Sequence, residues 1–458
     1  MTDLQVRTTA IAGLLVLDLP VHGDSRGWFK EGWQREKMLA LGLPDFEPVQ
    51  QNVSYNATAG ATRGIHAEPW DKLVSLVTGR AFGAWVDLRP GDGFGTTVTV
   101  DLHPGVAVFV PRGVGNSYQA LEDGTAYSYL VNDHWRPDVA YTAVALDDPE
   151  VAIAWPIPLD QAEVSAKDRA NPSLAEVTPM APRRTLVLGG GGQLGRALAA
   201  ALPAADVRAS DAFDVTDPAA YASFPWAEYD TVVNAAAYTA VDAAETEDGR
   251  RTAWAVNATA LTHLAQVARR HRLTVVHVSS DYVFDGTREV HDEDEPFSPL
   301  GVYGQSKAAG DAVVATLERH YVVRTSWVIG DGPNFVRTMA RLAREGVSPA
   351  VVDDQVGRLT FTDELARGIE HLLRTRPPYG TYDLTGAGPA TSWYDVARAV
   401  FARCGRDPDD VSPTSTAAYG EGKALAPRPA HSVLDLAKIE ATGFVPTPVA
   451  VSLDAYLS

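Results

Sequence analysis

The sequence of 458 residues contains one cysteine, Cys404, and few basic side chains. A single cysteine cannot form an intrachain disulfide and excludes a cluster of thiolate metal ligands, which fits a reducing compartment. The 39 Lys and Arg residues against 58 Asp and Glu residues give a formal net charge of −19. Such a charge opposes nucleic acid or an anionic membrane as the main partner. We therefore expect a cytoplasmic protein in which any anionic ligand meets local positive groups.

The start of the chain lacks the features of an export signal or an anchor. Residues 1–4 carry no basic segment, and the longest early apolar run, residues 11–17, is much shorter than the ~20 residues of a membrane span. We expect no membrane association. Because domains usually have roughly 100–200 residues, the length of the chain predicts two or three of them.

The first part of the sequence has the spacing of an all-β domain. Short apolar segments alternate with Gly and Pro turn signals, which is typical of an antiparallel barrel or jelly roll. These segments are residues 73–77, 85–88, 98–102, 106–110 and 127–131.

The pattern changes to alternating strands and helices after residue 182. Strands are expected at 185–188, 231–234 and 274–278, with an Ala/Leu-rich helix after the first and another helix near 251–270. This alternation predicts a doubly wound parallel sheet. Residues 169–183 contain three prolines and no clear period. We place the linker at 176–183, between an all-β domain over 1–175 and an α/β domain over 184–458.

A glycine-rich segment joins the first of these strands to its helix. Gly189, Gly192 and Gly195 let the backbone approach a pyrophosphate, and the helix N-terminus supplies N–H donors. A glycine triplet alone is also compatible with a plain tight turn. Asp211 is the best candidate acid after the strand that should follow this helix, and Arg208 lies close to it in the sequence. An acid would bind the ribose hydroxyl of NADH and an arginine the 2′-phosphate of NADPH, so both are candidate cofactors.

Tyr303 and Lys307 have a spacing that places a phenol and an ammonium group on one face of a helix. Lys307 is expected to lower the pKa of Tyr303, which would make the phenol a proton donor for a carbonyl reduced by hydride. Ser280, just beyond the strand at 274–278, adds a hydroxyl that can orient the same carbonyl. In isolation the Tyr–Lys pair would be read as a solvated helix face.

The second part of the chain resembles the extended short-chain dehydrogenase/reductase family, and within it the dTDP-4-dehydrorhamnose reductases. The segments that carry the resemblance are residues 192–195, 234–242, 279–286, 324–327 and 428–435. The resemblance implies that Ser280, Tyr303 and Lys307 form the catalytic triad and that the C-terminal lobe binds a nucleotide-sugar. It further implies cofactor contacts from Gly189, Gly192, Gln193, Leu194, Gly195, Asp214, Val215, Ala235, Ala236, Tyr303 and Lys307, and substrate contacts from Trp327 and Arg428.

The first part resembles the dTDP-4-dehydrorhamnose 3,5-epimerases, which are cupin-type barrels. Residues 24–31, 50–54, 63–66 and 72–74 carry this resemblance. The reaction needs a base beside the C4 ketone, cationic groups that hold the enolate, and an acid that returns a proton on the other face. The resemblance implies that His66 is the base, that Asp168 pairs with it, and that Lys72 and Arg63 are the cationic groups of the site. It implies substrate contacts from Arg26, Phe29, Glu31, Gln50, Asn52 and Arg63.

Two segments of the barrel depart from this family. The sequence has Trp135-Arg136-Pro137 in place of a Tyr-x-Pro sequence, and an indole cannot act as an acid near neutral pH. Residues 115–118 replace an Ala-His-Gly-Phe sequence. Reprotonation is left open among Tyr118, Tyr127, Tyr129, His134 and water.

His66 alone would be read as a structural histidine, and it has no further histidines at ligand spacing, so we expect no catalytic metal. The sequence predicts a fused epimerase and NAD(P)H-dependent 4-ketoreductase that acts on a dTDP-4-keto-6-deoxy sugar, and by resemblance a homodimer. One alternative is a reductase whose barrel is a weakened or single-centre epimerase or a binding domain. Another is a non-enzymatic regulatory protein on a reductase fold.

Overall fold

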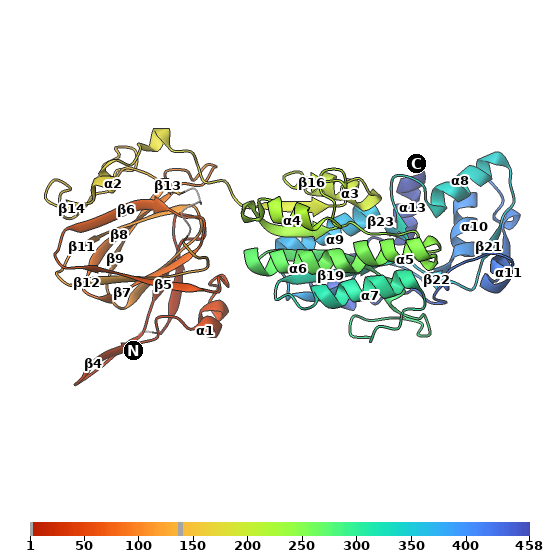
Figure 1. The fold of residues 1–458 in the computed structure, drawn as a ribbon, viewed down its shortest axis with the longest axis horizontal. Helices are drawn as coiled ribbons and strands as arrows, with labels where there is room; N and C mark the ends of the chain where they lie inside the picture. The colour runs from red at the N-terminus through yellow and green to blue at the C-terminus, as the bar shows by residue number, and fades with distance from the viewer. Residues whose placement is uncertain (1–2, 136–140) are drawn as a thin grey trace. The chain divides into compact units, whose positions relative to one another are not determined.

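The computed structural model describes residues 3–135 and 141–458 (Figure 1). The chain divides into two compact units, Met1–Pro182 and Arg183–Ser458. An all-β unit is therefore followed by an α/β unit, as the sequence predicts. Within the described residues, no helix combines the length and apolar character needed to cross a bilayer.

The first unit is a barrel of two antiparallel sheets, whose side chains share a core that includes Val74 and Val108 from one sheet and Trp85 and Tyr118 from the other. The order of the first sheet is β1 (Gln5–Thr8), β2 (Leu15–Asp18), β10 (Val106–Val110), β7 (Lys72–Thr78), β12 (Thr125–Val131) and β5 (Gln50–Asn56). The order of the second is β13 (Thr142–Ala143), β6 (Ala61–Ala67), β11 (Val114–Ala120), β8 (Ala81–Asp87) and β9 (Thr97–Leu102), and β14 (Glu163–Val164) pairs with β6 in parallel.

Strand position explains the different patterns of burial along these strands. β10 lies between β2 and β7, and all five of its residues are buried. β5 is an edge strand, and its side chains alternate between exposed Val53 and Tyr55 and less exposed neighbours. Outside the two sheets lie helix α1 (Arg35–Ala40), helix α2 (Ala166–Arg169), and a hairpin of β3 (Val21–Asp24) and β4 (Gly27–Lys30).

The second unit is built on one parallel sheet. Its order is β16 (Asp206–Arg208), β15 (Arg184–Leu188), β17 (Tyr229–Asn234), β18 (Thr274–Ser280), β19 (His320–Thr325) and β24 (Gly380–Asp383). Alternate residues of each strand point to opposite faces. On β15, Leu186 packs in a core with α6 (Ala260–His271), whereas Val187 packs in another with α3 (Gln193–Ala201) and α9 (Thr362–Thr375). Helices on both faces explain why these strands are continuous apolar runs.

The helix predicted near 251–270 is interrupted. α5 (Glu247–Trp254) and α6 are joined by one π-helical turn, Ala255–Thr259. Within this turn the buried Asn257 accepts a hydrogen bond from the Tyr238 N–H and donates to the Tyr238 carbonyl and to Ser306 Oγ. These bonds tie the turn to α7 (Val302–Val314) and to the loop after β17. A π turn of this kind is frequent at functional sites, and nothing in the periodicity predicts it.

The C-terminal part of this unit forms a lobe with its own core, which includes Val336, Phe361, Val396 and Phe401. Its helices are α8 (Phe335–Glu345), α10 (Trp393–Arg403), α11 (Thr416–Gly420) and α13 (Val449–Leu457), whereas α12 (Ala437–Ala441) packs on the parallel sheet through Ile439. Its strand pairs are β20 (Val328–Ile329) with β23 (Thr360–Phe361), β21 (Ala350–Val352) with β26 (Ser412–Thr414), and β22 (Val356–Gly357) with β25 (Thr391–Ser392). On the face of the parallel sheet that α6 covers, α4 (Pro218–Ser223) packs with α6.

Candidate active sites

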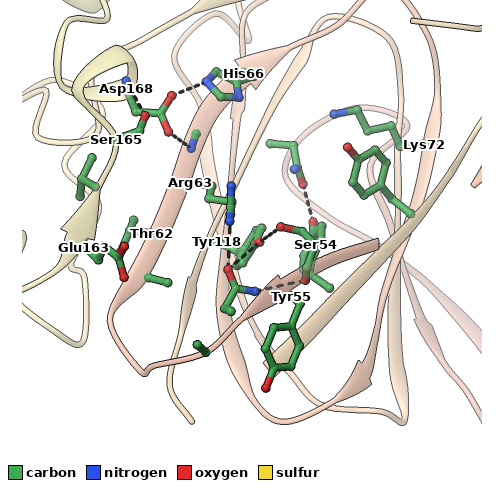
Figure 2. Close-up of a pocket in the computed structure, with 18 of the residues that line it drawn as sticks. Ser54, Tyr55, Thr62, Arg63, His66, Lys72, Tyr118, Glu163, Ser165 and Asp168 are labelled. Carbon is green, nitrogen blue, oxygen red and sulfur yellow. Dashed lines mark hydrogen bonds and ion pairs between the residues drawn. The ribbon is translucent and has the colours of Figure 1, made fainter. Parts of the chain in front are cut away.

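The first unit brings His66 of β6 and Asp168 of α2 together. His66 Nε2 lies 2.8 Å from Asp168 Oδ1, and a dashed line marks this interaction in Figure 2. Ser165 caps the short helix by accepting the Asp168 N–H, and Asp168 Oδ2 accepts the Gly64 N–H. Because a carboxylate only accepts hydrogen bonds, Nε2 carries the proton of the neutral imidazole. Nδ1 is then the nitrogen that can act as a base.

This pair lines a cavity of about 620 Å³. Arg63 and Lys72 line it as well, so the base and both predicted cations share one space (Figure 2). Arg63 Nε donates to Asn56 Oδ1 at 3.3 Å. The arrangement places a base and positive charge around one bound group, as enolate formation requires.

Glu68 is a further residue of the cavity that the sequence reasoning missed. It forms an ion pair with the buried Lys72 and accepts a hydrogen bond from Trp70 Nε1 at 3.1 Å. The pair offsets part of the positive charge that Lys72 brings to the cavity. Glu68 lies one residue beyond β6 and two positions after His66. Because side chains two positions apart point to the same side of an extended chain, this spacing was the signal available in the sequence.

The candidate proton donors differ in what their polar atoms contact. Tyr118 donates to Ser54 Oγ at 3.0 Å, and Tyr127 donates to Asn116 Oδ1 at 2.8 Å. Tyr129 lines the cavity beside Lys72, whose Nζ is 5.4 Å from the ring centroid. Burial is the main cause that raises the pKa of Tyr129, so this phenol keeps its proton.

The fourth named donor, His134, and the departing residue Trp135 lie on the segment after β12. His134 is exposed, and its Nδ1 is 3.3 Å from Gln50 Oε1. The Trp135 side chain is 61% exposed. Arg136 and Pro137, which complete the departure from the family sequence, lie outside the described residues. Of the four named donors, Tyr118, Tyr127 and Tyr129 line the cavity.

Several predicted substrate residues lie on other elements of the barrel. Arg26 and Phe29 belong to the β3–β4 hairpin, which projects from the barrel in Figure 1, and Phe29 is 65% exposed. Glu31 pairs with Lys37 at 2.6 Å. On β5, Gln50 Nε2 donates to Asn52 Oδ1 at 3.0 Å. The cavity lining includes Arg63 but none of these other five predicted substrate residues.

The second unit places Gly189 and Gly195 where only glycine fits. Gly189 has a φ of +86°, and a Cβ there would lie 2.5 Å from Ala236 N. A Cβ at Gly195 would lie 2.2 Å from Gly189 O, so the strand, turn and helix pack at backbone distance. Gly192 is the N-cap of α3, and the buried Gln193 Oε1 has no hydrogen-bond partner. This cradle fits the pyrophosphate of a dinucleotide.

The cradle lies at the switch point of the sheet. The chain passes from β15 to β16 on one side and then to β17 on the other, which opens a crevice at the carboxyl ends of β15 and β17. Ala235 and Ala236 follow β17 there. Val215 packs against the core, and Asp214 accepts hydrogen bonds from the N–H and hydroxyl of Thr216. Predicted cofactor residues therefore come from three successive connections.

Ser280, Tyr303 and Lys307 meet at the next strand. Ser280 is the last residue of β18 rather than a residue beyond it, and Tyr303 and Lys307 lie on α7, which packs on that strand. All three are buried. Lys307 Nζ donates to the Val278 carbonyl at 2.7 Å, and Ser280 Oγ donates to Asp281 Oδ1 at 2.9 Å. The alternative of a solvated helix face is wrong for this helix.

The expected effect of Lys307 on Tyr303 is not observed. Burial raises the pKa of Tyr303 well above its ordinary value; the Ser280 hydroxyl lowers it, and Asp281 and Asp311 raise it. Burial also lowers the pKa of Lys307 to about 8, opposed by the charge of Asp311. Both shifts have one cause, because a buried site disfavours charge on either group. The phenol is therefore held in its protonated form.

The remaining predicted residues of this unit are held by neighbours. Arg428 donates to Asp242 Oδ1 at 2.8 Å, which ties the C-terminal segment to the loop after β17. Trp327 has a φ of +45° and stacks on Trp393 with 3.7 Å between the ring centroids. Arg208 pairs with a carboxylate of its own strand, and the other ribose candidate, Asp211, is exposed. Among the described residues, no three His, Cys, Asp or Glu side chains are placed to hold a metal.

Comparisons with known proteins give the same division of the chain. The model of the RmlD substrate binding domain matches residues 183–458, and that of dTDP-4-dehydrorhamnose 3,5-epimerase matches residues 8–176. A Streptococcus pyogenes protein named RmlC homolog is 47% identical over 38% of this chain and 90% of its own length. A dTDP-4-dehydrorhamnose reductase of Aggregatibacter actinomycetemcomitans is 38% identical over 56% of this chain and 92% of its own.

Among solved structures, a Bacillus anthracis dTDP-4-dehydrorhamnose reductase in complex with NADP has a TM-score of 0.55. It is 32% identical, and the match covers 60% of this chain and 98% of that one. The relatives are thus matched over nearly their whole length, each by one unit of the chain. The chain belongs to the RmlD substrate binding domain family, and its first unit belongs to the dTDP-4-dehydrorhamnose 3,5-epimerase family.

Proposed function

We propose that the protein is a bifunctional enzyme, a dTDP-4-keto-6-deoxyhexose 3,5-epimerase joined to an NAD(P)H-dependent 4-ketoreductase, and that it makes dTDP-L-rhamnose or a related deoxysugar. One observation carries the proposal: a His66–Asp168 pair in a cavity that Arg63 and Lys72 also line and a buried Ser280–Tyr303–Lys307 site occur in one chain. The product of the first reaction is the substrate of the second. Joining the two steps raises the local concentration of the intermediate.

In the first reaction, His66 Nδ1 removes a proton from a carbon next to the C4 ketone. Lys72 and Arg63 stabilise the negative charge that develops on the ketone oxygen. Asp168 holds the imidazole and stabilises the imidazolium that forms. A proton then returns on the opposite face, and Tyr129 is the donor that the cavity favours, because it is protonated and is not engaged as Tyr118 and Tyr127 are.

In the second reaction, Tyr303 donates the proton that the C4 oxygen needs as the ketone is reduced. The Ser280 hydroxyl, which donates to Asp281 Oδ1 in the structure, turns to donate a hydrogen bond to the same oxygen, and Lys307 supports the phenol from the next turn of α7. A bound nicotinamide dinucleotide supplies the hydride. The turn from Gly189 to Gly195 holds its pyrophosphate, and the C-terminal lobe holds the nucleotide-sugar, with Arg428 among its contacts.

We assign the epimerase to residues 1–175, the linker to 176–183 and the reductase with its substrate lobe to 184–458. We also propose that the protein is a homodimer. The exposed β3–β4 hairpin carries Arg26 and Phe29, which do not line the cavity of their own barrel. In a dimer this hairpin can reach a second copy. Sedimentation velocity of the full chain tests this proposal of a homodimer. A monomeric protein would contradict it.

The activity is tested by incubating the full chain with dTDP-4-keto-6-deoxyglucose and NADPH, with NADH in a parallel reaction. We expect conversion to one reduced dTDP-deoxysugar without added epimerase, identified by NMR. If reduction required a separate epimerase, the bifunctional proposal would fail.

A second candidate function is a reductase whose barrel epimerises one centre or only binds the sugar-nucleotide. It is favoured by the exposed Trp135 in place of the family tyrosine and by the Glu68–Lys72 pair. The two functions differ in which carbons exchange hydrogen with solvent when no NAD(P)H is present.

A further inference from the structure

Behind Lys307 lies a group of buried polar residues that the reaction described above does not use. His277 of β18, Asp311 of α7, Asn234 of β17 and Arg324 of β19 are each no more than 3% exposed. Most buried polar groups in proteins are paired, because each unpaired one costs free energy. Their contacts converge on the Lys307 side chain.

His277 is the direct neighbour of the lysine. Lys307 Nζ lies 3.4 Å from His277 Nε2 and donates to the Val278 carbonyl at 2.7 Å. An ammonium group has three N–H donors and no acceptor. Two of the three are therefore used by consecutive residues of β18. These two contacts leave one N–H of the ammonium group, and Tyr303 lies one turn before Lys307 on α7.

The contact with Lys307 determines the tautomer of His277. Burial, with the charge of Lys307 as second cause, lowers the pKa of His277 far below its ordinary value, so the ring is neutral. To accept an N–H from an ammonium group, Nε2 must carry the lone pair, which puts the ring proton on Nδ1. Asn234 Nδ2 is the amide atom that lies 3.2 Å from Nδ1, and exchanging the amide oxygen and nitrogen of Asn234 places Oδ1 there to accept this proton.

Asp311 completes the arrangement on the helix side. Its Oδ2 accepts a hydrogen bond from Arg324 Nε at 3.2 Å, while Oδ1 has no hydrogen-bond partner and lies 3.7 Å from His277 Nε2. Its negative charge favours the charged form of Lys307. The lysine thus has a neutral acceptor in contact and a carboxylate nearby.

We propose that His277, as the Nδ1–H tautomer supported by Asn234, is a positioning residue of the reductase: it holds Lys307 charged and directed toward Tyr303. The inference rests on the reductase function proposed above. It concerns residues of this chain to which no role in the reaction is otherwise given. The groups of this site that carry charge or titrate are His277 on β18, Tyr303 and Asp311 on α7, Arg324 on β19, Asp281 after β18, and Glu245 of the loop after β17, which accepts the Val302 N–H at the start of α7.

A pH profile of ketone reduction tests the proposal. Reduction requires charged Lys307, so kcat falls as the pH rises through the pKa of the lysine, which burial lowers to about 8. A hydrogen bond to the charged form raises a pKa, and its loss lowers it. In His277→Leu we expect the basic limb to move to lower pH by about one unit, a roughly tenfold change in the protonation ratio. His277→Gln keeps an acceptor and should stay near the wild-type limb.

The matched control is His371→Gln, which alters a buried histidine of α9 that bonds to Thr442. Its basic limb should equal that of the wild type. A purely structural role of His277 would lower the amount of folded enzyme without moving the limb. A folded His277→Leu protein with the wild-type limb overturns the proposal.

A second measurement keeps the test decisive if His277→Leu does not fold. In the ¹⁵N NMR spectrum of histidine-labelled full chain, the resonances absent from His277→Gln belong to this ring. We expect a protonated Nδ1 and a bare Nε2, unchanged as the pH is varied across the activity range. A protonated Nε2 would overturn the inference. A wild type that reduces no ketone would instead defeat the proposed function, and the tautomer would still decide whether this hydrogen bond exists.

Discussion

The two units solve the problem of holding reactive groups in different ways. In the second unit, one strand end and one helix face supply Ser280, Tyr303 and Lys307, and all three are buried. In the first unit, His66 and Asp168 are 102 positions apart, and the imidazole remains about one third exposed in an open cavity. The buried group therefore comes from two adjacent elements, whereas the barrel site combines side chains from several elements that are far apart in the sequence.

The largest expected effect is on the compact site. Tyr303→Phe removes the hydroxyl that donates the proton, and general acid catalysis is typically worth about 10²–10⁴-fold. We expect kcat for NADPH-dependent reduction to fall by that factor while hydrogen exchange by the first unit stays unchanged. Stopped-flow absorbance of NADPH and NMR exchange measure the two rates. Reduction by the variant at the wild-type rate would remove Tyr303 from the mechanism.

The converse variant removes the activity of the first unit and leaves that of the second unchanged. His66→Gln removes the base, and we expect solvent exchange at the sugar carbons to fall by about 10²–10⁴-fold. Reduction of an epimerised substrate should not change. His103→Gln, at an exposed histidine of the same unit, is the control and should exchange normally. If His66→Gln exchanged as fast as this control, the base would have to be another residue.

A feature of the fold or of a site could be predicted from the sequence when its residues lie close together along the chain. The Gly189–Gly195 turn and the Tyr303–Lys307 pair are local, so spacing alone predicted their elements. His277 and Asn257 were missed because their roles come from contacts across strands and helices. The pKa of Tyr303 was predicted in the wrong direction, because spacing shows a nearby charge but not the burial that outweighs it.

Burial of charge in the second unit should appear as a pH dependence of its stability. Burial raises the pKa of Asp281 to about 6 from 3.8. The folded state therefore holds a proton that the unfolded state releases, and stability is lost as the pH rises from about 4 through about 6. Asp281→Asn removes the charge, and we expect the free energy of unfolding at pH 7 to rise by on the order of 2–3 kcal/mol.

Denaturant unfolding of the second unit between pH 4 and pH 8 measures this change. Asp294→Asn, at an exposed carboxylate of the same unit, should retain the wild-type pH dependence. An Asp281→Asn protein with the wild-type slope would show that the folded state does not hold the proton at this site.

The smallest expected effect is that of Trp135→Phe, and its comparison with Tyr129→Phe tests which residue is the proton donor in the barrel. Trp135 is exposed and has no acidic proton, so Trp135→Phe should change exchange by no more than about twofold, as for most surface substitutions. Tyr129→Phe should slow exchange at one or both carbons by more than about tenfold, because it removes a phenol of the cavity. The reverse order of effects, measured by NMR, would remove Tyr129 as the donor.

The most direct test of the bifunctional account is hydrogen exchange by the full chain in deuterated buffer, with dTDP-4-keto-6-deoxyglucose and no NAD(P)H. The account predicts deuterium at both C3 and C5 of the sugar, and a reduced product carrying both labels once NADPH is added. Label at one carbon would make the barrel a single-centre epimerase. Absence of label, with reduction seen only after a separate epimerase is supplied, would contradict the account and leave the second unit as the only enzyme of the chain.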